Sequence, residues 1–337
     1  MTRRPEALIV MDGATFAGQF DEARLARLAA LASTAEPLWT DTLDTPEVRD
    51  RLAEVEVLIT GWGVPRLTAD RLEAMPKLRA LLHCAGSVRG FAGPQVWERG
   101  VAVSNAAHVN AVPVAEYTLA AILFDGKKAP FLANDARVHR EDWAYAGRRG
   151  ELSNLGRTVG IVGFSKVGRR VVEHLRSFGS LECVVYDPHV PVAEVHAVGA
   201  RAVGLDELLA CSDVVSVHAP ALESTRRMFG AAEFAAMREH ATFINTARGS
   251  LVDTDALASA CATGRIHAIL DVTDPEPLPA ESPLYSLPNV MLTPHIAGSL
   301  GSETRRMTDH ALDELERWAA GAPLAAPVTA GDLELSA

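Results

Sequence analysis

The chain has 337 residues, of which 48% are hydrophobic and 22% are charged, and its formal net charge at pH 7 is −11. This length accommodates two domains, and the composition excludes a disordered chain. The negative charge argues against a nucleic-acid partner and against an anionic membrane surface, because both are bound by basic faces.

The four cysteines are widely separated and form no C-x-x-C pair, which is typical of core residues in a reducing compartment. The apolar run at residues 7–11 is too short for a signal peptide, and no stretch is expected to reach membrane-spanning length. We therefore expect a cytoplasmic protein. No residue pattern predicts a metal site.

Strand and helix patterns alternate through the first hundred residues. An apolar strand pattern at 7–11 precedes a helical pattern over about 21–32. Further strands are predicted at 55–60, 78–83 and 101–104. Thr68 is the predicted N-cap of the helix between the first two of these. These elements predict a small α/β domain.

The loop at residues 84–90 consists mostly of small residues and follows a predicted strand. Its backbone N–H groups can face an anion. On the residues alone a simple turn is the favoured interpretation, because glycine-rich turns are common between elements.

A change in composition after residue 104 predicts a domain boundary. A long helix is expected from about Val114, with Pro113 in its first turn, where proline is tolerated. Glu116 argues against a membrane span at this helix. Residues 127–149 are polar and carry no clear pattern.

Residues 157–172 indicate a strand, a glycine-containing turn and a helix, the arrangement that binds a dinucleotide pyrophosphate. Gly163 allows the tight turn and Gly168 the close packing of helix on strand. Ser165 replaces the middle glycine of the G-x-G-x-x-G pattern, so its Cβ would push the backbone away while its hydroxyl could donate to a phosphate oxygen. Asp187 ends the next apolar run, where a carboxylate can accept bonds from ribose hydroxyls. An ordinary βα connection is the alternative interpretation.

Apolar strand patterns continue to alternate with helical patterns as far as a helix predicted over about 302–319 and a Pro/Ala-rich tail. The predicted strands are 182–186, 214–218, 242–245, 266–271 and 290–292. Continuous apolar runs of this kind predict a parallel sheet with both faces covered by helices. Ligands bind beyond the carboxyl ends of such strands. The candidate residues there are Asp187, His218, Thr246, Ala247, Arg248, Asp271 and His295.

Arg248, Glu276 and His295 lie at strand ends or in adjacent loops, where their side chains could converge. A guanidinium can hold a substrate carboxylate with two hydrogen bonds, and an imidazole can exchange a proton with an alcohol or carbonyl oxygen. A carboxylate can orient that imidazole and stabilise its charged form. Taken one at a time, Arg248 is better explained as part of a surface ion pair, Glu276 as a solvated loop acid and His295 as a helix-start residue. Together with the glycine turn they favour a functional site.

With these motifs the chain resembles the D-isomer-specific 2-hydroxyacid dehydrogenase family, which includes phosphoglycerate dehydrogenase-like enzymes. The resemblance covers nearly the whole chain, and the segments around Arg248 and His295 are its most specific parts. The matching segments are 160–168 with Asp187, 217–220, 245–253, 270–272 with Glu276 and Pro277, and 293–298.

The resemblance implies two doubly wound parallel-sheet domains. A Rossmann-type NAD domain at 107–298 would be inserted into a discontinuous, flavodoxin-like substrate domain formed by 1–106 and 299–337. A cytoplasmic homodimer acting on a small 2-oxo or 2-hydroxy acid is expected.

The resemblance also implies roles for single residues. Arg248 would bind the substrate carboxylate, His295 would be the general acid/base, and Glu276 would hydrogen-bond His295. The residues expected to bind NAD are Gly163, Ser165, Lys166, Val167, Gly168, Asp187, His218, Pro220, Thr225, Thr246, Ala247, Arg248, Asp271, His295 and Gly298. The residues expected to bind substrate are Ala85, Gly86, Ser87, Arg89 and Arg248.

Arg89 belongs to a segment, 88–91, that departs from the family, which often has an Asp-containing sequence there. A cation at this position suits a distal carboxylate or phosphate on the substrate, and a solvated surface arginine is the alternative. Two rival functions for the whole chain also stay open. One is oxidation of formate or phosphite on the same scaffold, and the other is a non-catalytic protein that senses NAD(H).

Overall fold

We describe residues 4–335 of a computed structural model. Two compact units make up the chain: unit 1 holds the residues up to Asn110 and those from Ser299 onwards, and unit 2 is Ala111–Gly298. The sequence predicted that the chain passes from one domain to the other after residues 106 and 298. The first of these boundaries lies instead within helix α6 (Ala107–Asp125), which continues without a break from unit 1 into unit 2.

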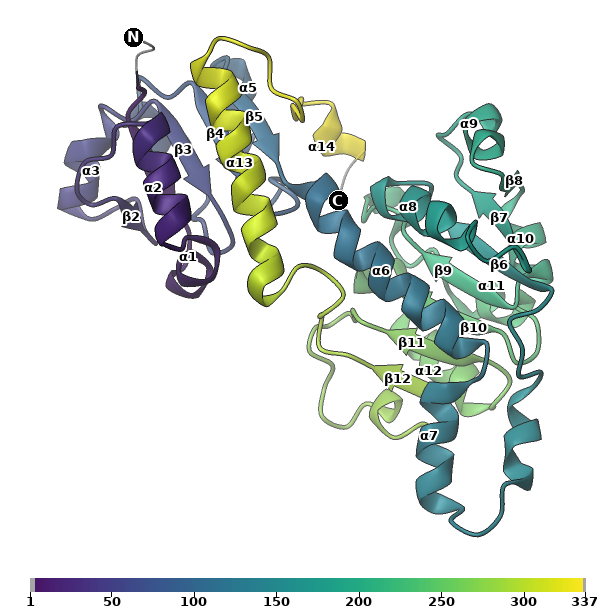
Figure 1. Cartoon of the computed structure of the whole chain (residues 1–337). Helices are drawn as coiled ribbons and strands as arrows, with labels where there is room; N and C mark the ends of the chain where they lie inside the picture. The colour runs from purple at the N-terminus through teal and green to yellow at the C-terminus, as the bar shows by residue number, and fades with distance from the viewer. Residues whose placement is uncertain (1–3, 336–337) are drawn as a thin grey trace. The chain divides into compact units, whose positions relative to one another are not determined.

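Unit 1 is built on a parallel five-stranded sheet with the strand order β2-β1-β3-β4-β5, the flavodoxin-like order (Figure 1). Its strands are β1 (Ala7–Val10), β2 (Trp39–Thr40), β3 (Val57–Thr60), β4 (Ala80–His83) and β5 (Ala102–Asn105). Its helices are α1 (Gly13–Gln19), α2 (Glu22–Leu31), α3 (Pro46–Leu52), α4 (Ala69–Glu73), α5 (Gln95–Glu98), η5 (Gly301–Glu303), α13 (Thr304–Ala319) and α14 (Asp332–Leu335).

Both faces of this sheet are buried, as continuous apolar runs predict. Ile9 belongs to a buried cluster with Leu28 of α2 and Leu312 of α13. Its neighbour Leu8 belongs to a different cluster, which contains Leu52 of α3. Since successive side chains of a strand point to opposite faces, α2 and α13 cover one face of the sheet and α3 covers the other.

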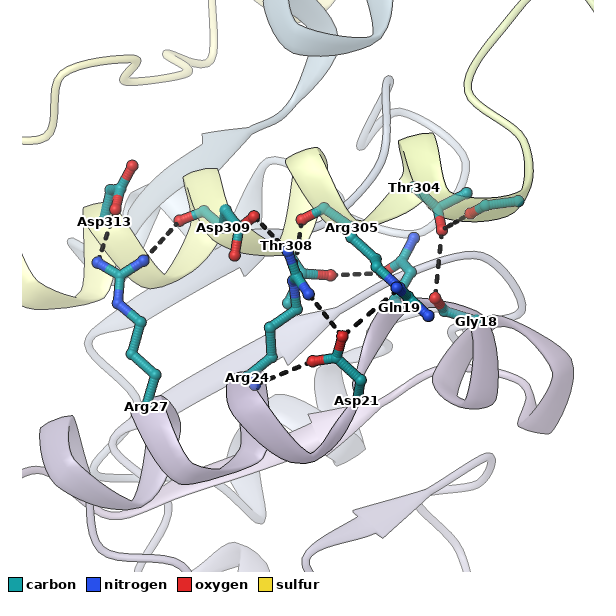
Figure 2. Close-up of polar contacts among 11 residues, drawn as sticks. Gly18, Gln19, Asp21, Arg24, Arg27, Thr304, Arg305, Thr308, Asp309 and Asp313 are labelled. Atoms are coloured by element: carbon teal, nitrogen blue, oxygen red, sulfur yellow. Dashed lines mark hydrogen bonds and ion pairs between the residues drawn. The ribbon is translucent and has the colours of Figure 1, made fainter.

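Helices α2 and α13 are also joined by ion pairs, although they come from opposite ends of the chain. Arg24 Nη2 lies 2.5 Å from Asp309 Oδ2, and Arg27 Nη2 lies 2.6 Å from Asp313 Oδ1 (Figure 2). Partly exposed pairs of this kind contribute about 0–1 kcal/mol each. The apolar contacts of α13 therefore contribute more than the ion pairs to holding the two pieces of unit 1 together.

Unit 2 is built on a parallel seven-stranded sheet with the order β12-β11-β10-β9-β6-β7-β8 (Figure 1). Its strands are β6 (Arg157–Val162), β7 (Leu181–Tyr186), β8 (Arg201–Ala202), β9 (Val214–Val217), β10 (Thr242–Asn245), β11 (His267–Leu270) and β12 (Val290–Leu292). The strand order reverses at β6, which lies between β7 and β9. This is the Rossmann arrangement, and its switch point is where such sheets bind dinucleotides.

Helices and short 3-10 turns connect these strands. They are α6, α7 (Ala129–Val138), η1 (Ala144–Arg149), α8 (Lys166–Leu175), α9 (Val192–Ala197), α10 (Leu205–Cys211), η2 (Glu223–Thr225), α11 (Ala231–Ala236), η3 (Gly249–Leu251), α12 (Thr254–Ala262) and η4 (Pro283–Tyr285). Ile161 packs in one buried cluster and Val162 in another, so this sheet too is covered on both faces.

The structure differs from the prediction at the start of α6. The helix begins at Ala107 rather than near Val114, and Pro113 lies inside it. The N-terminal signal is Asn105, whose Oδ1 accepts a hydrogen bond from Ala107 N at 3.1 Å. By length and composition alone α6 is apolar enough to cross a membrane, contrary to the expectation that no stretch is. Its side chains Ala115 and Ile122 nevertheless lie in the core of unit 2.

Other differences concern local detail. Thr68 stands at the predicted N-cap position of α4, but its side chain makes no capping hydrogen bond. The polar segment 127–149 forms α7 and η1. All four cysteines are free; Cys84 and Cys261 are buried, and the other two are half-buried.

Candidate active site

The glycine turn after β6 has the shape that a dinucleotide requires. Gly163 has φ +93°, and a Cβ there would lie 2.4 Å from Ala219 N. A Cβ on Gly168 would lie 2.1 Å from Gly163 O. Only glycine fits at either position without displacing backbone. The carboxyl end of β6, the turn and α8 are therefore in direct backbone contact.

Ser165 fits the turn without strain. Its backbone is extended, with φ −73° and ψ −172°, so the position needs no glycine. The residue is the N-cap of α8, and its hydroxyl accepts a long hydrogen bond of 3.5 Å from Gly168 N. The first-turn N–H groups of Lys166 and Val167 have no acceptor within the helix, so they are available to an anion.

Asp187 is tied to the same turn. Its Oδ2 accepts a hydrogen bond from Phe164 N at 2.7 Å, and its Oδ1 accepts one from His189 N at 2.9 Å. Each carboxylate oxygen keeps a further lone pair for a ribose hydroxyl. The turn and Asp187 thus fit an adenosine dinucleotide at both its pyrophosphate and its ribose.

His218, at the end of β9, is buried and neutral. Burial lowers the pKa of His218 to about 3. Its Nε2 lies 2.9 Å from Ser216 Oγ, while Nδ1 has no hydrogen-bond partner among residues 4–335. The hydroxyl of Thr225 donates to Pro220 O at 2.6 Å and accepts from Leu222 N at 2.8 Å, so it stabilises its own turn.

The loop after β10 is shaped by Asn245. The Oδ1 of Asn245 accepts from Ala247 N at 3.0 Å, and its Nδ2 donates to Arg248 O at 2.9 Å. A Cβ on Gly249 would lie 2.0 Å from the carbonyl carbon of Thr273, so the loops after β10 and β11 touch backbone to backbone. The side chain of Arg248 is exposed, and its Nη1 donates to Ala247 O at 2.7 Å. The neighbouring Thr246 is buried.

Glu276 and His295 form a direct pair. His295 Nδ1 lies 2.7 Å from Glu276 Oε1, and the two side chains are 50% and 41% exposed. His295 has φ +54°, an uncommon conformation for a residue other than glycine. Backbone kept in such a region is concentrated at functional sites. The pair engages Nδ1, so Nε2 of the imidazole is directed away from Glu276.

The loop that carries His295 is held by the buried carboxylate of Asp271. Oδ1 accepts from Thr293 Oγ1 at 2.6 Å and from Ile296 N at 2.8 Å, and Oδ2 accepts from Ala297 N at 2.9 Å. Tyr117 of α6 lies 2.8 Å from Thr293 Oγ1. Tyr117 carried no sequence signal, because nothing in a helical pattern marks a residue that reaches a loop so distant in the sequence.

The expected substrate residues Ala85, Gly86, Ser87 and Arg89 all lie in unit 1, whereas Arg248, Glu276, His295 and the expected cofactor residues lie in unit 2. A Cβ at Gly86 would meet nothing within 4 Å, so this part of the loop is open. Ser87 Oγ accepts from Arg89 N at 3.3 Å. The exposed guanidinium of Arg89 donates to the carbonyl of Leu333. Within residues 4–335 no cluster of three or more His, Cys, Asp or Glu side chains is placed to hold a metal.

Comparison with known proteins gives consistent matches. The model of the family described as "D-isomer specific 2-hydroxyacid dehydrogenase, NAD binding domain" matches residues 129–297. The chain is 33% identical over 285 residues to D-3-phosphoglycerate dehydrogenase of Mycobacterium bovis, covering 84% of this chain and 52% of that protein. It is 37% identical over 248 residues to glyoxylate/hydroxypyruvate reductase B of Citrobacter koseri, covering 72% and 76%.

Among solved structures, a phosphoglycerate oxidoreductase from Rhizobium etli superposes with a TM-score of 0.79 at 27% identity, covering 96% of this chain and 98% of that one. The chain spans about half the length of the phosphoglycerate dehydrogenases it matches.

Proposed function

Because the chain belongs to the D-isomer specific 2-hydroxyacid dehydrogenase family, with an NAD-binding domain in unit 2, we propose that it interconverts a 2-oxo acid and a D-2-hydroxy acid. The cofactor is a nicotinamide dinucleotide. The observation that supports the reaction most is the pairing of Glu276 with His295 at 2.7 Å beside the carboxyl ends of β11 and β12. A histidine with one nitrogen held by a carboxylate is suited to proton transfer at the other.

In this proposal His295 Nε2 donates a proton to the keto oxygen during reduction and takes it back from the hydroxyl during oxidation. Glu276 accepts the Nδ1 proton, which fixes the orientation of the ring and stabilises its positive charge. Arg248 binds the substrate carboxylate with two hydrogen bonds and polarises the neighbouring keto group. The bound nicotinamide supplies or accepts the hydride.

Residues of unit 2 hold the cofactor in this proposal. The N–H groups at the start of α8 bind the pyrophosphate, and Asp187 binds the adenosine ribose. NAD(H) is favoured over NADP(H), because the carboxylate of Asp187 would repel a 2′-phosphate and residues 188–190 supply no arginine to neutralise it. The pocket would be completed by His218, Pro220, Thr225, Thr246, Ala247, Asp271 and Gly298.

The loop at 85–87 would bind the substrate carboxylate through its backbone N–H groups. We further propose that the protein is a cytoplasmic homodimer. In this proposal the second copy would cover exposed apolar side chains of unit 2, among them Phe124, Trp143 and Leu155, which are 62%, 79% and 76% exposed. Light scattering of the purified chain tests the dimer.

The function is tested by NADH oxidation with a panel of 2-oxo acids, followed by NAD⁺ reduction with formate and with phosphite. We expect turnover of one or more 2-oxo acids and of neither formate nor phosphite. Turnover of formate or phosphite alone would replace the proposed substrate class. Binding of NADH without any turnover would identify a cofactor-sensing protein instead.

A further inference from the structure

Three side chains from separate segments of unit 2 form a hydrogen-bonded chain through their oxygen atoms. Tyr117 on α6 lies 2.8 Å from the hydroxyl of Thr293, which follows β12. That hydroxyl lies 2.6 Å from Oδ1 of Asp271, which follows β11. This hydrogen-bonded chain therefore connects α6 to the loop that carries His295.

The direction of these hydrogen bonds follows from the chemistry of the three groups. Asp271 accepts from two backbone N–H groups, one on each oxygen, as an ionised carboxylate does. The single proton of the Thr293 hydroxyl is donated to Asp271, so Thr293 Oγ1 must accept its other bond from Tyr117. Burial raises the pKa of Tyr117, the charge of Asp271 raises it further, and the bond to Thr293 opposes both, so the phenol keeps its proton.

Asp271 in turn holds three consecutive backbone amides. Its main-chain oxygen accepts from His295 N at 3.0 Å, and its carboxylate accepts from Ile296 N at 2.8 Å and Ala297 N at 2.9 Å. The left-handed backbone of His295 is thus fixed on its C-terminal side by a single buried residue. Any rotation of the Asp271 carboxylate would shift two of these amides.

We propose that Tyr117 is a positioning residue for His295, acting through Thr293 and Asp271. The hydroxyl of Tyr117 orients that of Thr293, which holds the Asp271 carboxylate in the rotamer that binds the 295–297 amides. This inference rests on the proposed role of His295. It adds to the reaction a residue of α6 that acts through two neighbouring side chains.

The test removes one hydroxyl at a time. Tyr117→Phe is expected to lower kcat for 2-oxo acid reduction about 3- to 10-fold, the size of one lost hydrogen bond. The KM for the 2-oxo acid should change less than about 2-fold, because Tyr117 is not among the residues proposed to bind the substrate. Hydrogen exchange of the peptide that contains residues 293–298, measured by mass spectrometry without substrate, should become faster.

Tyr285 supplies a matched control. It lies in the same unit, and its hydroxyl donates to Leu278 O at 3.2 Å, outside the hydrogen-bonded chain of Tyr117, Thr293 and Asp271. Tyr285→Phe should leave kcat and the exchange of 293–298 unchanged. Thr293→Val should reproduce Tyr117→Phe, and Thr293→Ser, which keeps the hydroxyl, should restore the parent values.

The outcomes separate this inference from the proposed function. If the parent protein turns over no 2-oxo acid, the proposed function fails, but the exchange measurement still shows whether Tyr117 holds the loop. Unchanged exchange in Tyr117→Phe would overturn the inference whatever the activity. Faster exchange with an unchanged kcat in an active enzyme would also overturn it, because the loop would then be held without benefit to His295.

Discussion

Glu276 Oε1 lies 2.7 Å from Nδ1 of His295, although 19 residues separate them in the chain. They meet because β11 and β12 pair in parallel, so the loops that follow these strands leave the sheet at the same edge. Both side chains are close to half exposed. An exposed pair contributes about 0–1 kcal/mol to stability, so substitutions here separate catalysis from folding.

We expect His295→Gln to lower kcat about 10²–10⁴-fold, the usual contribution of a positioned acid/base. Glu276→Gln should lower it less, because the imidazole keeps a hydrogen-bond partner but loses the neighbouring charge. NADH binding and the melting temperature should stay close to those of the parent in both variants. Steady-state kinetics and cofactor titration check these values. A parallel loss of NADH affinity would place His295 in cofactor binding rather than proton transfer.

Asp187 is expected to decide between the two nicotinamide cofactors. Replacing it with Ser removes the carboxylate from the ribose site and the repulsion of a 2′-phosphate. The ratio of kcat/KM for NADH over NADPH should then fall roughly 10- to 100-fold, the value of a hydrogen bond to a charged group. Asp187→Asn is the control that keeps an acceptor for the bond from Phe164 N. A parent enzyme that prefers NADPH would contradict the assignment.

Arg89 is expected to recognise a second anion on the substrate. Arg89→Gln should raise KM about 10-fold for 2-oxo acids with a distal carboxylate or phosphate and leave those with neutral side chains unchanged. Arg66→Gln, an exposed arginine of the same unit, is the control. An equal effect on both substrate types would show that Arg89 acts by holding the carbonyl of Leu333 and so shaping the loop.

Buried histidines should make the fold sensitive to acid. Burial lowers the pKa of His267 to about 3, and both of its ring nitrogens lack a hydrogen-bond partner within the described residues. The unfolded chain binds a proton at this residue below about pH 6.5, whereas the folded chain stays neutral down to about pH 3. The free energy of unfolding therefore falls as the pH decreases from about 6.5 to 3, by up to about 1.4 kcal/mol per pH unit for one histidine.

Replacing His267 with Phe removes this titration without breaking a hydrogen bond, and the ring at this position packs 4.7 Å from that of Phe131. Urea unfolding of the full chain at pH 7, 6 and 5 should show a shallower pH dependence in His267→Phe than in the parent. Equal slopes would mean that His267 already carries a proton in the folded state or that other groups dominate the slope.

The side chain of Lys128 is buried beside Thr242, the first residue of β10, at the opposite end of that strand from the Arg248 loop. Its Nζ donates to Asp125 Oδ1 at 3.0 Å, to His240 O at 3.0 Å and to Thr242 Oγ1 at 2.6 Å. Lys128→Met removes one of the two cations paired with the Asp125 carboxylate, which keeps Arg157 Nη2 at 2.9 Å, so the free energy of unfolding should fall by about 1–3 kcal/mol. Lys127→Met, at the exposed neighbour, should change stability by less than about 0.5 kcal/mol. Urea unfolding compares the two.

The inner strands of both sheets could be predicted from the sequence, because they are buried on both faces and appear as continuous apolar runs. The same argument located Asp187, Arg248 and His295 at strand ends. The edge strands β2 and β8 were missed, because two residues are too few to form a pattern.

Features that depend on distant contacts gave no sequence signal. The segment after α13 is fixed by the buried carboxylate of Glu314, which accepts from Ala325 N at 2.8 Å and Ala326 N at 2.7 Å. Val328 N then donates to Val103 O at 2.8 Å beside β5. A Pro/Ala-rich stretch reveals none of these three bonds, because its partners lie elsewhere in the chain. Tyr117 was missed for the same reason.

The division of unit 1 between two stretches of sequence sets an order of events on the ribosome. Residues 111–298 are synthesised as one contiguous block and can complete their core before α13 exists. The first strand cannot, because the cluster around Ile9 includes Ala311, Leu312 and Leu315. One apolar face of the five-stranded sheet therefore stays exposed to water until α13 has been synthesised. During this interval the newly made protein is most prone to aggregation.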